Sequence, residues 1–220
     1  MESTIHFSVV RAHGFARGNH HKSNCFVLRN PERACTIPAM KCPYRRILVV
    51  GSGGAGKSTL AVELARRLSL PVVHLDKLWW LPGWKERTEA EFDALLEAEL
   101  AKPEWVIDGN FRRTFARRLE RAELCIFLDY PESVCMDGIL RRAQEYRGRT
   151  RSDMTDGCPE RIDSEFREWV RTFRSLVRPE MISAMNESPV QKLIFTSREE
   201  TAGWLSSLGK QQSSAKKRAE

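Results

Sequence analysis

Long apolar runs are missing from this 220-residue sequence. No window approaches the roughly 18 consecutive apolar residues of a transmembrane helix, which excludes a membrane span. The first thirty residues also lack an apolar stretch of signal-peptide length, which argues against secretion. We therefore expect a cytoplasmic protein.

Cys-x-x-Cys pairs are also absent. The six cysteines are Cys25, Cys35, Cys42, Cys125, Cys135 and Cys158. A zinc site could combine the first two with His20 and His21, but the tight spacing of structural zinc sites is missing. Cys125 lies inside an apolar segment and is expected to be a small buried hydrophobe. Reduced thiols fit a cytoplasmic protein.

Excess charge of either sign is nearly absent from the centre of the chain, although the net charge is +7. Residues 1–39 carry five basic residues against two acidic ones, and residues 210–220 carry four against one. The rest has a net charge of only +1, from 27 basic and 26 acidic residues. The basic ends suggest a nucleic-acid partner, but they say little about the folded part.

The sequence pattern changes near residue 44. Before it, apolar fragments are short and lack a helical or strand period, whereas after it apolar segments alternate with amphipathic ones. We expect residues 1–39 to be a disordered extension, or the product of a mis-assigned start codon with Met40 as the natural start. Residues 40–209 are expected to form one domain, and residues 210–220 a flexible basic tail.

Five apolar segments rich in β-branched residues predict strands. They are Arg46–Val50, Val72–Leu75, Trp105–Asp108, Leu124–Asp129 and Gln191–Thr196. Helical periodicity predicts amphipathic helices at Lys57–Leu68, Glu89–Ala101, Pro131 to about Tyr146, and Ile162–Val177. This alternation indicates a three-layer α/β fold, in which helices cover both faces of a five-stranded parallel sheet.

A glycine-rich loop follows the first predicted strand. It matches the phosphate-binding pattern G-x-x-x-x-G-K-[ST] with Gly51, Ser52, Gly53, Gly54, Ala55, Gly56, Lys57 and Ser58, and Thr59 follows. Glycines let backbone N–H groups turn inward around phosphate oxygens, and the positive end of the next helix strengthens the site. We predict that Lys57 contacts the β- and γ-phosphates of ATP and that the Ser58 hydroxyl binds Mg²⁺.

A second oxygen ligand for Mg²⁺ is expected at the carboxyl edge of the sheet, where ligands bind in open α/β folds. Asp108 and Asp129 both end predicted strands there. Asp108 precedes Gly109-Asn110, a turn that would expose its carboxylate beside the glycine-rich loop, so we predict Asp108 as the metal partner. For Asp129, capping the following helix is at least as good an explanation.

Arginines crowd the segment after the fourth predicted strand, at Arg141, Arg142, Arg147, Arg149 and Arg151. The last three surround Gly148 in a loop that could close over the phosphates as a lid. Positioned guanidinium groups stabilise the charge of a phosphoryl-transfer transition state. Arg147 and Arg149 are our catalytic candidates, although a solvated basic surface would show the same run.

The end of the second predicted strand is where an acceptor molecule would lie. Asp76 there could orient an acceptor hydroxyl or act as a general base. Three tryptophans follow, which could line the acceptor pocket or pack a lid onto the sheet: Trp79, Trp80 and Trp84. Arg112 and Arg113 could bind an acceptor phosphate or be ordinary exposed helix residues.

Several motifs together resemble those of the bacterial DNA topology modulation protein family. They are Gly51–Thr59, His74-Leu75-Asp76, Pro82-Gly83-Trp84, Trp105–Asn110 and Asp153-Met154 with Gly157-Cys158-Pro159-Glu160-Arg161. That family belongs to the P-loop NTPases related to adenylate and shikimate kinases, and the resemblance covers roughly residues 42–205. It implies a P-loop kinase-like domain at 40–209 with a helical, arginine-rich lid.

Two functions follow as expectations. The first is an ATP-dependent phosphotransferase with Mg²⁺ and an unidentified small-molecule acceptor, such as a nucleoside or nucleotide. The alternative is a nucleotide-dependent regulator associated with DNA topology that transfers no phosphate. The family name and the basic ends support this alternative, but the central region has almost no net charge and no helix-turn-helix pattern.

Overall fold

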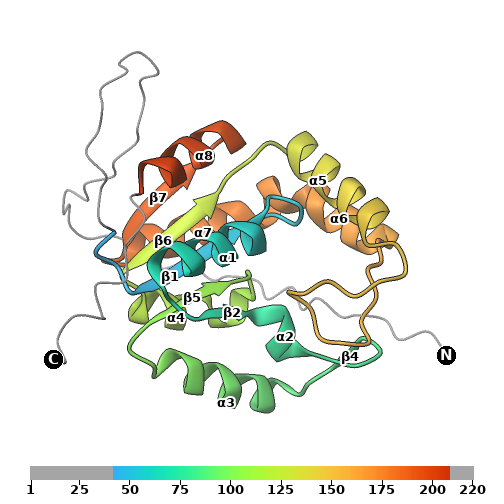
Figure 1. Ribbon diagram of the computed structural model, residues 1–220, viewed down its shortest axis with the longest axis horizontal. Helices are drawn as coiled ribbons and strands as arrows, with labels where there is room; N and C mark the ends of the chain where they lie inside the picture. Colours follow the sequence, from blue (N-terminus) through green and yellow to red (C-terminus); the bar gives the residue numbers. More distant parts are fainter. Residues whose placement is uncertain (1–41, 209–220) are drawn as a thin grey trace, which may run out of the picture.

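The structure of the protein is a computed structural model that describes residues 42–208 (Figure 1). The expected extension at 1–39 and the basic tail at 210–220 lie outside these described residues. The conceivable zinc site at Cys25 and Cys35 lies outside them as well.

A five-stranded parallel sheet forms the centre of the fold, with the strand order β2-β5-β1-β6-β7 (Figure 1). The strands are β1 (Arg46–Gly51), β2 (Val72–His74), β5 (Trp105–Asp108), β6 (Leu124–Leu128) and β7 (Gln191–Phe195). All five predicted strands are confirmed, each to within one residue at either end. Because these strands are parallel, the carboxyl ends of β1, β2 and β5 lie at the same edge of the sheet.

Helices cover both faces of this sheet. One face is covered by α1 (Lys57–Leu68), α5 (Glu132–Glu145) and α8 (Arg198–Ser207). The other is covered by α3 (Glu89–Leu100), α4 (Phe115–Arg121) and α7 (Arg178–Glu187). Alternate residues of β1 enter the two cores, Ile47 and Val49 the first, Leu48 and Val50 the second, and all four are fully buried. The predicted three-layer α/β architecture is thus confirmed.

The helix predicted at Ile162–Val177 is part of a longer helical segment. It consists of α6 (Ser164–Thr172), a π-helical turn (Phe173–Val177) and α7, which continues to Glu187. Pro179 lies in the first turn of α7, where a missing N–H costs nothing. Because a proline in a sequence usually ends a helix, the sequence pattern did not predict α7.

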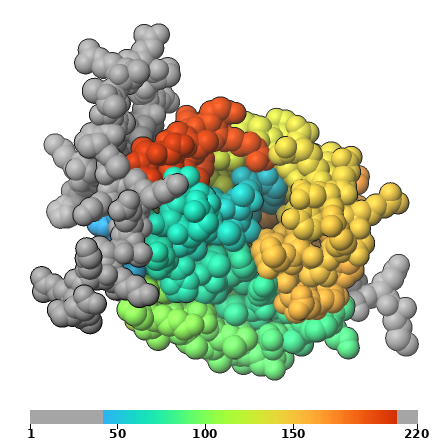
Figure 2. Space-filling model, in the orientation of Figure 1, coloured from blue at the N-terminus to red at the C-terminus, as the bar shows by residue number. Residues whose placement is uncertain are grey.

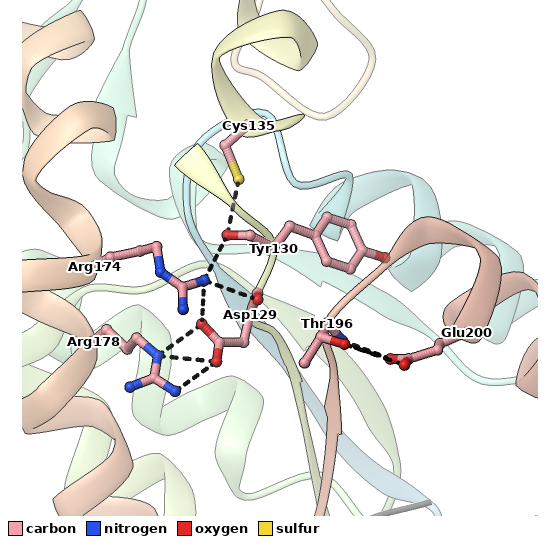
Figure 3. A network of polar contacts seen from close by, with 7 residues as sticks. All are labelled: Asp129, Tyr130, Cys135, Arg174, Arg178, Thr196 and Glu200. Atoms are coloured by element: carbon pink, nitrogen blue, oxygen red, sulfur yellow. Dashed lines mark hydrogen bonds and ion pairs between the residues drawn. The ribbon is translucent and has the colours of Figure 1, made fainter. Parts of the chain in front are cut away.

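The buried carboxylate of Asp129 anchors this helical segment to the sheet (Figure 3). It accepts hydrogen bonds from Nε and Nη2 of Arg178 at 2.7 to 2.9 Å and from Arg174 at 3.3 Å. Helix α5 is preceded by Pro131 and has no side-chain cap. Asp129 therefore does not cap α5, and its negative charge is neutralised by two arginine side chains.

Between β2 and α3 the chain forms small elements that the sequence pattern did not predict. Helix α2 (Leu75–Trp79) leads into a two-stranded antiparallel ribbon of β3 (Trp80–Leu81) and β4 (Lys85–Glu86). Gly83 and Trp84 both have positive φ at the turn of this ribbon. The ribbon projects beyond the sheet edge beside the segment that follows α5 (Figure 1).

Within residues 42–208, no helix combines the length and the apolar character that crossing a membrane requires. The four cysteines in this range are buried free thiols: Cys42, Cys125, Cys135 and Cys158. Cys125 is fully buried in β6, as predicted, and burial raises the pKa of its thiol to about 12.

Candidate active site

The glycine-rich loop joins the end of β1 to the first turn of α1. Gly54 and Gly56 have φ values of 76° and 92°, a region that side chains other than glycine rarely adopt, and Gly56 immediately precedes the helix. Lys57 is the first helical residue, and its Nζ donates to the carbonyl oxygen of Ser52 at 2.9 Å. The predicted strand, loop and helix of a phosphate-binding site are therefore all in place.

Two helices pack closely on this loop. A methyl group built on Gly138 of α5 would overlap the carbonyl group of Gly54, with 2.9 Å to its carbon atom. A methyl group on Gly53 would lie 2.8 Å from Phe166 and 3.0 Å from Val170, both of α6. Close packing by α5 and α6 thus fixes the path of the loop.

An asparagine that follows β5 clamps the first glycine of the loop. Asn110 accepts a hydrogen bond from N–H of Gly51 at 3.1 Å and donates one to its carbonyl oxygen at 2.8 Å. The turn that carries Asn110 is held by Arg118, which is fully buried and donates to the backbone oxygens of residues 109, 110 and 111. Burial lowers the pKa of Arg118 to about 9. The sequence placed Asn110 in the turn after Asp108 but did not predict its contact with Gly51, and Arg118 was assigned no role.

Asp108 lies against Ser58, as the sequence predicted for a metal pair. The Ser58 hydroxyl donates to Oδ2 of Asp108 at 2.6 Å, and Asp108 is 4% exposed. A hydroxyl and a carboxylate are hard oxygen donors of the kind that Mg²⁺ prefers. Among residues 42–208 no group of three or more His, Cys, Asp or Glu side chains is arranged to hold a metal ion. Ser58 and Asp108 are thus the residues at this edge of the sheet that could hold a Mg²⁺ ion.

Asp76 and Lys57, both partly buried, belong to one charge cluster with the buried Asp108. Burial lowers the pKa of Lys57, against the opposing effect of the Asp108 and Asp76 carboxylates. Burial also raises the pKa of Asp76, and the negative charge of Asp108 raises it further, while Lys57 and Arg151 act in the other direction. The structure thus brings the predicted phosphate-binding lysine and the predicted acceptor-side carboxylate together.

Residues 147–163, which we call the lid, dock on the ribbon β3–β4 (Figure 2). Thr155 Oγ1 donates to the carbonyl oxygen of Trp80 at 2.7 Å, and N–H of Gly83 donates to that of Gly157 at 3.0 Å. The Nε1 atom of Trp84 donates to the carbonyl oxygen of Pro159 at 3.1 Å. Of the two roles considered for the tryptophans, the contacts of Trp80 and Trp84 show the packing of a lid, whereas Trp79 packs on Phe92 and Phe111.

The arginines near the lid divide into two groups. Arg142 and Arg151 point inward and share Glu160, with distances of 2.9 and 2.6 Å, and the Glu160 side chain is 3% exposed. Arg142 lowers the pKa of Lys57, and Arg151 opposes the rise in the pKa of Asp76, so both act on the charge cluster. Arg147 and Arg149 are exposed instead, and Arg149 lies over the Tyr146 ring.

The two arginines considered for an acceptor phosphate are engaged elsewhere. Arg112 forms an ion pair with Glu180 of α7, and Arg113 forms one with Asp93 of α3 at 2.6 Å. Both side chains are about half-exposed. These contacts fit the simpler explanation of exposed surface arginines.

A cavity of about 470 Å³ adjoins the phosphate-binding loop. It lies between α5 and the beginning of α8 and is lined by Val134, Asp137, Leu140, Arg141, Gln144 and Arg198. Arg198 connects it to the loop, because its Nη2 donates to the carbonyl oxygen of Gly54 at 3.1 Å. The helical pattern alone did not reveal this cavity, since Val134 on one wall and Arg198 on the other are 64 residues apart in the chain.

No protein-family model matches the chain. A sequence relative is the uncharacterized protein YqaC of Bacillus subtilis (strain 168), 25% identical over 131 residues, which are 59% of this chain and 72% of that protein. The DNA topology modulation family stays a prediction, because this relative has no characterised role.

Solved structures show a likeness of fold. Shikimate kinase from Acinetobacter baumannii in complex with shikimate is 15% identical, with a TM-score of 0.51 over 74% of this chain and 90% of that one. A gluconokinase from Sinorhizobium meliloti 1021 is 18% identical, with a TM-score of 0.44 over 78% and 92%. The chain has a P-loop kinase-like fold.

Proposed function

We propose that the protein is an ATP-dependent phosphotransferase that acts on a hydroxyl group of a small molecule. The observation that supports this most strongly is the shared charge cluster of Lys57, Asp76 and Asp108. The loop suited to a triphosphate follows β1, and Asp76, the carboxylate suited to an acceptor hydroxyl, lies in α2 directly after β2. Both therefore lie at the carboxyl edge of the sheet, on either side of the end of β5. Kinases of small molecules also share this fold.

The phosphate-binding loop, from Gly51 to Thr59, would hold the triphosphate through its inward N–H groups and Lys57. Ser58 and Asp108 would hold Mg²⁺, which when bound neutralises charge on the β- and γ-phosphates. The cavity beside Arg198 would take the nucleobase and sugar, because Arg198 lines it and also donates a hydrogen bond to the carbonyl oxygen of Gly54.

Asp76 would accept the proton of the acceptor hydroxyl as its oxygen attacks the γ-phosphorus. The raised pKa of Asp76 suits this role, because a stronger base takes a hydroxyl proton more readily. The bond between the γ-phosphorus and the bridging oxygen would break as the bond to the acceptor oxygen forms, so that ADP is the leaving group and Asp76 keeps the proton until the product departs.

Arg142 and Arg151 are the lid arginines that the geometry favours for the transferring phosphate. Glu160 holds both guanidinium groups from one side, which fixes them before substrate binds. The exposed Arg147 and Arg149, selected from sequence, would need the lid to rearrange before they reached the phosphate.

The test is phosphate transfer from γ-labelled ATP by the full-length protein to a panel of nucleosides, nucleotides, sugar acids and hydroxy acids. We expect one class to be phosphorylated, and transfer to fall by about 10²–10⁴-fold in Asp76→Asn. Arg151→Gln should lower transfer about tenfold or more, whereas Arg147→Gln should stay within about twofold. Slow ATP hydrolysis with no phosphorylated acceptor, together with salt-dependent DNA binding, would instead support the DNA-associated regulator.

A further inference from the structure

His74 contacts Asp108 of the charge cluster, and the proposed phosphoryl transfer gives His74 no role. It ends β2, and the parallel register pairs it directly with Asp108 of β5. Its Nδ1 lies 2.5 Å from Oδ1 of Asp108, and the two side chains are 10% and 5% exposed. A buried contact this close, between two residues in register, is fixed by the sheet itself.

Both oxygens of the Asp108 carboxylate have a partner. Oδ2 accepts from Ser58 at 2.6 Å and Oδ1 faces His74. A carboxylate accepts hydrogen bonds, so this contact is a hydrogen bond in the tautomer of His74 that carries its proton on Nδ1. Ser58 and His74 contact different oxygens and together hold the carboxylate in one orientation. A single donor would leave the carboxylate free to rotate.

We propose that His74 is a positioning residue that orients Asp108 for the Mg²⁺ bound with the nucleotide. This inference rests on the proposed function. A serine hydroxyl has one hydrogen and two lone pairs, so Ser58 can donate to Asp108 while a lone pair faces the cation. That arrangement requires the carboxylate to stay in one rotamer, and His74 holds it there. Outer partners of this kind commonly set how tightly a metal binds.

Two substitutions separate the hydrogen bond from the bulk of the ring. In His74→Asn the amide nitrogen is as many bonds from Cα as Nδ1 is, so the donor is retained. In His74→Gln the amide nitrogen corresponds in position to Nε2, so the donor to Asp108 is displaced. Both variants are neutral and polar, and a loss of stability common to both does not affect their comparison.

The measurement is calorimetric ATP affinity of the full-length protein, once in EDTA and once in Mg²⁺. For wild type and His74→Asn we expect the same gain in affinity from Mg²⁺. For His74→Gln we expect the affinity in EDTA to be unchanged to within about twofold. The gain in affinity from Mg²⁺ should be smaller than in wild type by a factor of about ten or more.

An equal gain from Mg²⁺ in all three proteins would overturn the role of His74 and leave the proposed function standing. A loss of affinity in His74→Gln that is as large in EDTA as in Mg²⁺ would also overturn it, because a purely structural role predicts that result. If wild type bound no ATP under either condition, the proposed function itself would fail.

Discussion

Gly138 gives a sharp test of how α5 packs on the phosphate-binding loop. It lies inside a helix, and its φ is not positive, so the backbone itself accepts any residue. Alanine at such a position ordinarily stabilises a protein by about 0.4–1 kcal/mol. Here the added methyl group would overlap the carbonyl group of Gly54, whose carbon and Cα would lie 2.9 and 3.0 Å away.

The magnitude follows from these opposing effects. Forcing a methyl group into a filled contact costs about 1–3 kcal/mol, which exceeds the helix gain, so Gly138→Ala should destabilise the protein by about 1–2 kcal/mol. In a domain of this size, that corresponds to a Tm lower by about 2–8 °C. The contact is with loop backbone, so the loop should shift and ATP affinity should fall about tenfold.

Gly203 provides the matched control. It also lies inside a helix, α8, but a methyl group there would meet nothing within 4 Å. Gly203→Ala should therefore raise Tm by about 1–4 °C and leave ATP affinity unchanged. Thermal unfolding and calorimetric ATP titration of both variants give the result. A Gly138→Ala protein as stable as Gly203→Ala, with normal ATP affinity, would refute the packing argument.

Two further predictions concern the carboxylates of Asp76, which is partly buried, and Asp129, which is buried. The pKa of Asp76 is raised in the folded state, so its contribution to stability is present at low pH and is lost as the pH rises through that pKa. Asp76→Asn, which stays neutral, should therefore raise Tm at neutral pH by about 2–4 °C while phosphate transfer is lost; a lower Tm would contradict the sign. Asp129→Ala removes the acceptor of Arg174 and Arg178 and should lower the free energy of unfolding by about 1.5–3 kcal/mol in urea titration, since both arginines are partly exposed. An unchanged urea midpoint would mean that this ion pair does not anchor α7.

The sheet and the phosphate-binding loop could be predicted because their signals are local. Each strand is a continuous apolar run, since both faces of a parallel sheet are buried. The loop is a contiguous motif between one such run and an amphipathic helix, so strand, loop and helix support one another. Asp108 could be placed for the same reason, since it ends a strand beside that loop.

The rest of the site depends on contacts between distant segments. Arg142 and Arg151 both form ion pairs with the buried carboxylate of Glu160, whereas Arg147 and Arg149 are exposed, and the sequence does not show which arginines Glu160 reaches. Asn110 clamps Gly51 across 59 residues of chain, which no periodicity reveals. The partner of His74 could be identified only from the register of β2 and β5.

ATP binding measured by calorimetry on wild type and Lys57→Ala tests the central claim most directly. A charged hydrogen bond to phosphate contributes about 1.5–3 kcal/mol, so the variant should bind ATP at least about tenfold more weakly. Equal affinity in the two proteins, or no ATP binding by wild type, would contradict the assignment of residues 51–59 to the triphosphate.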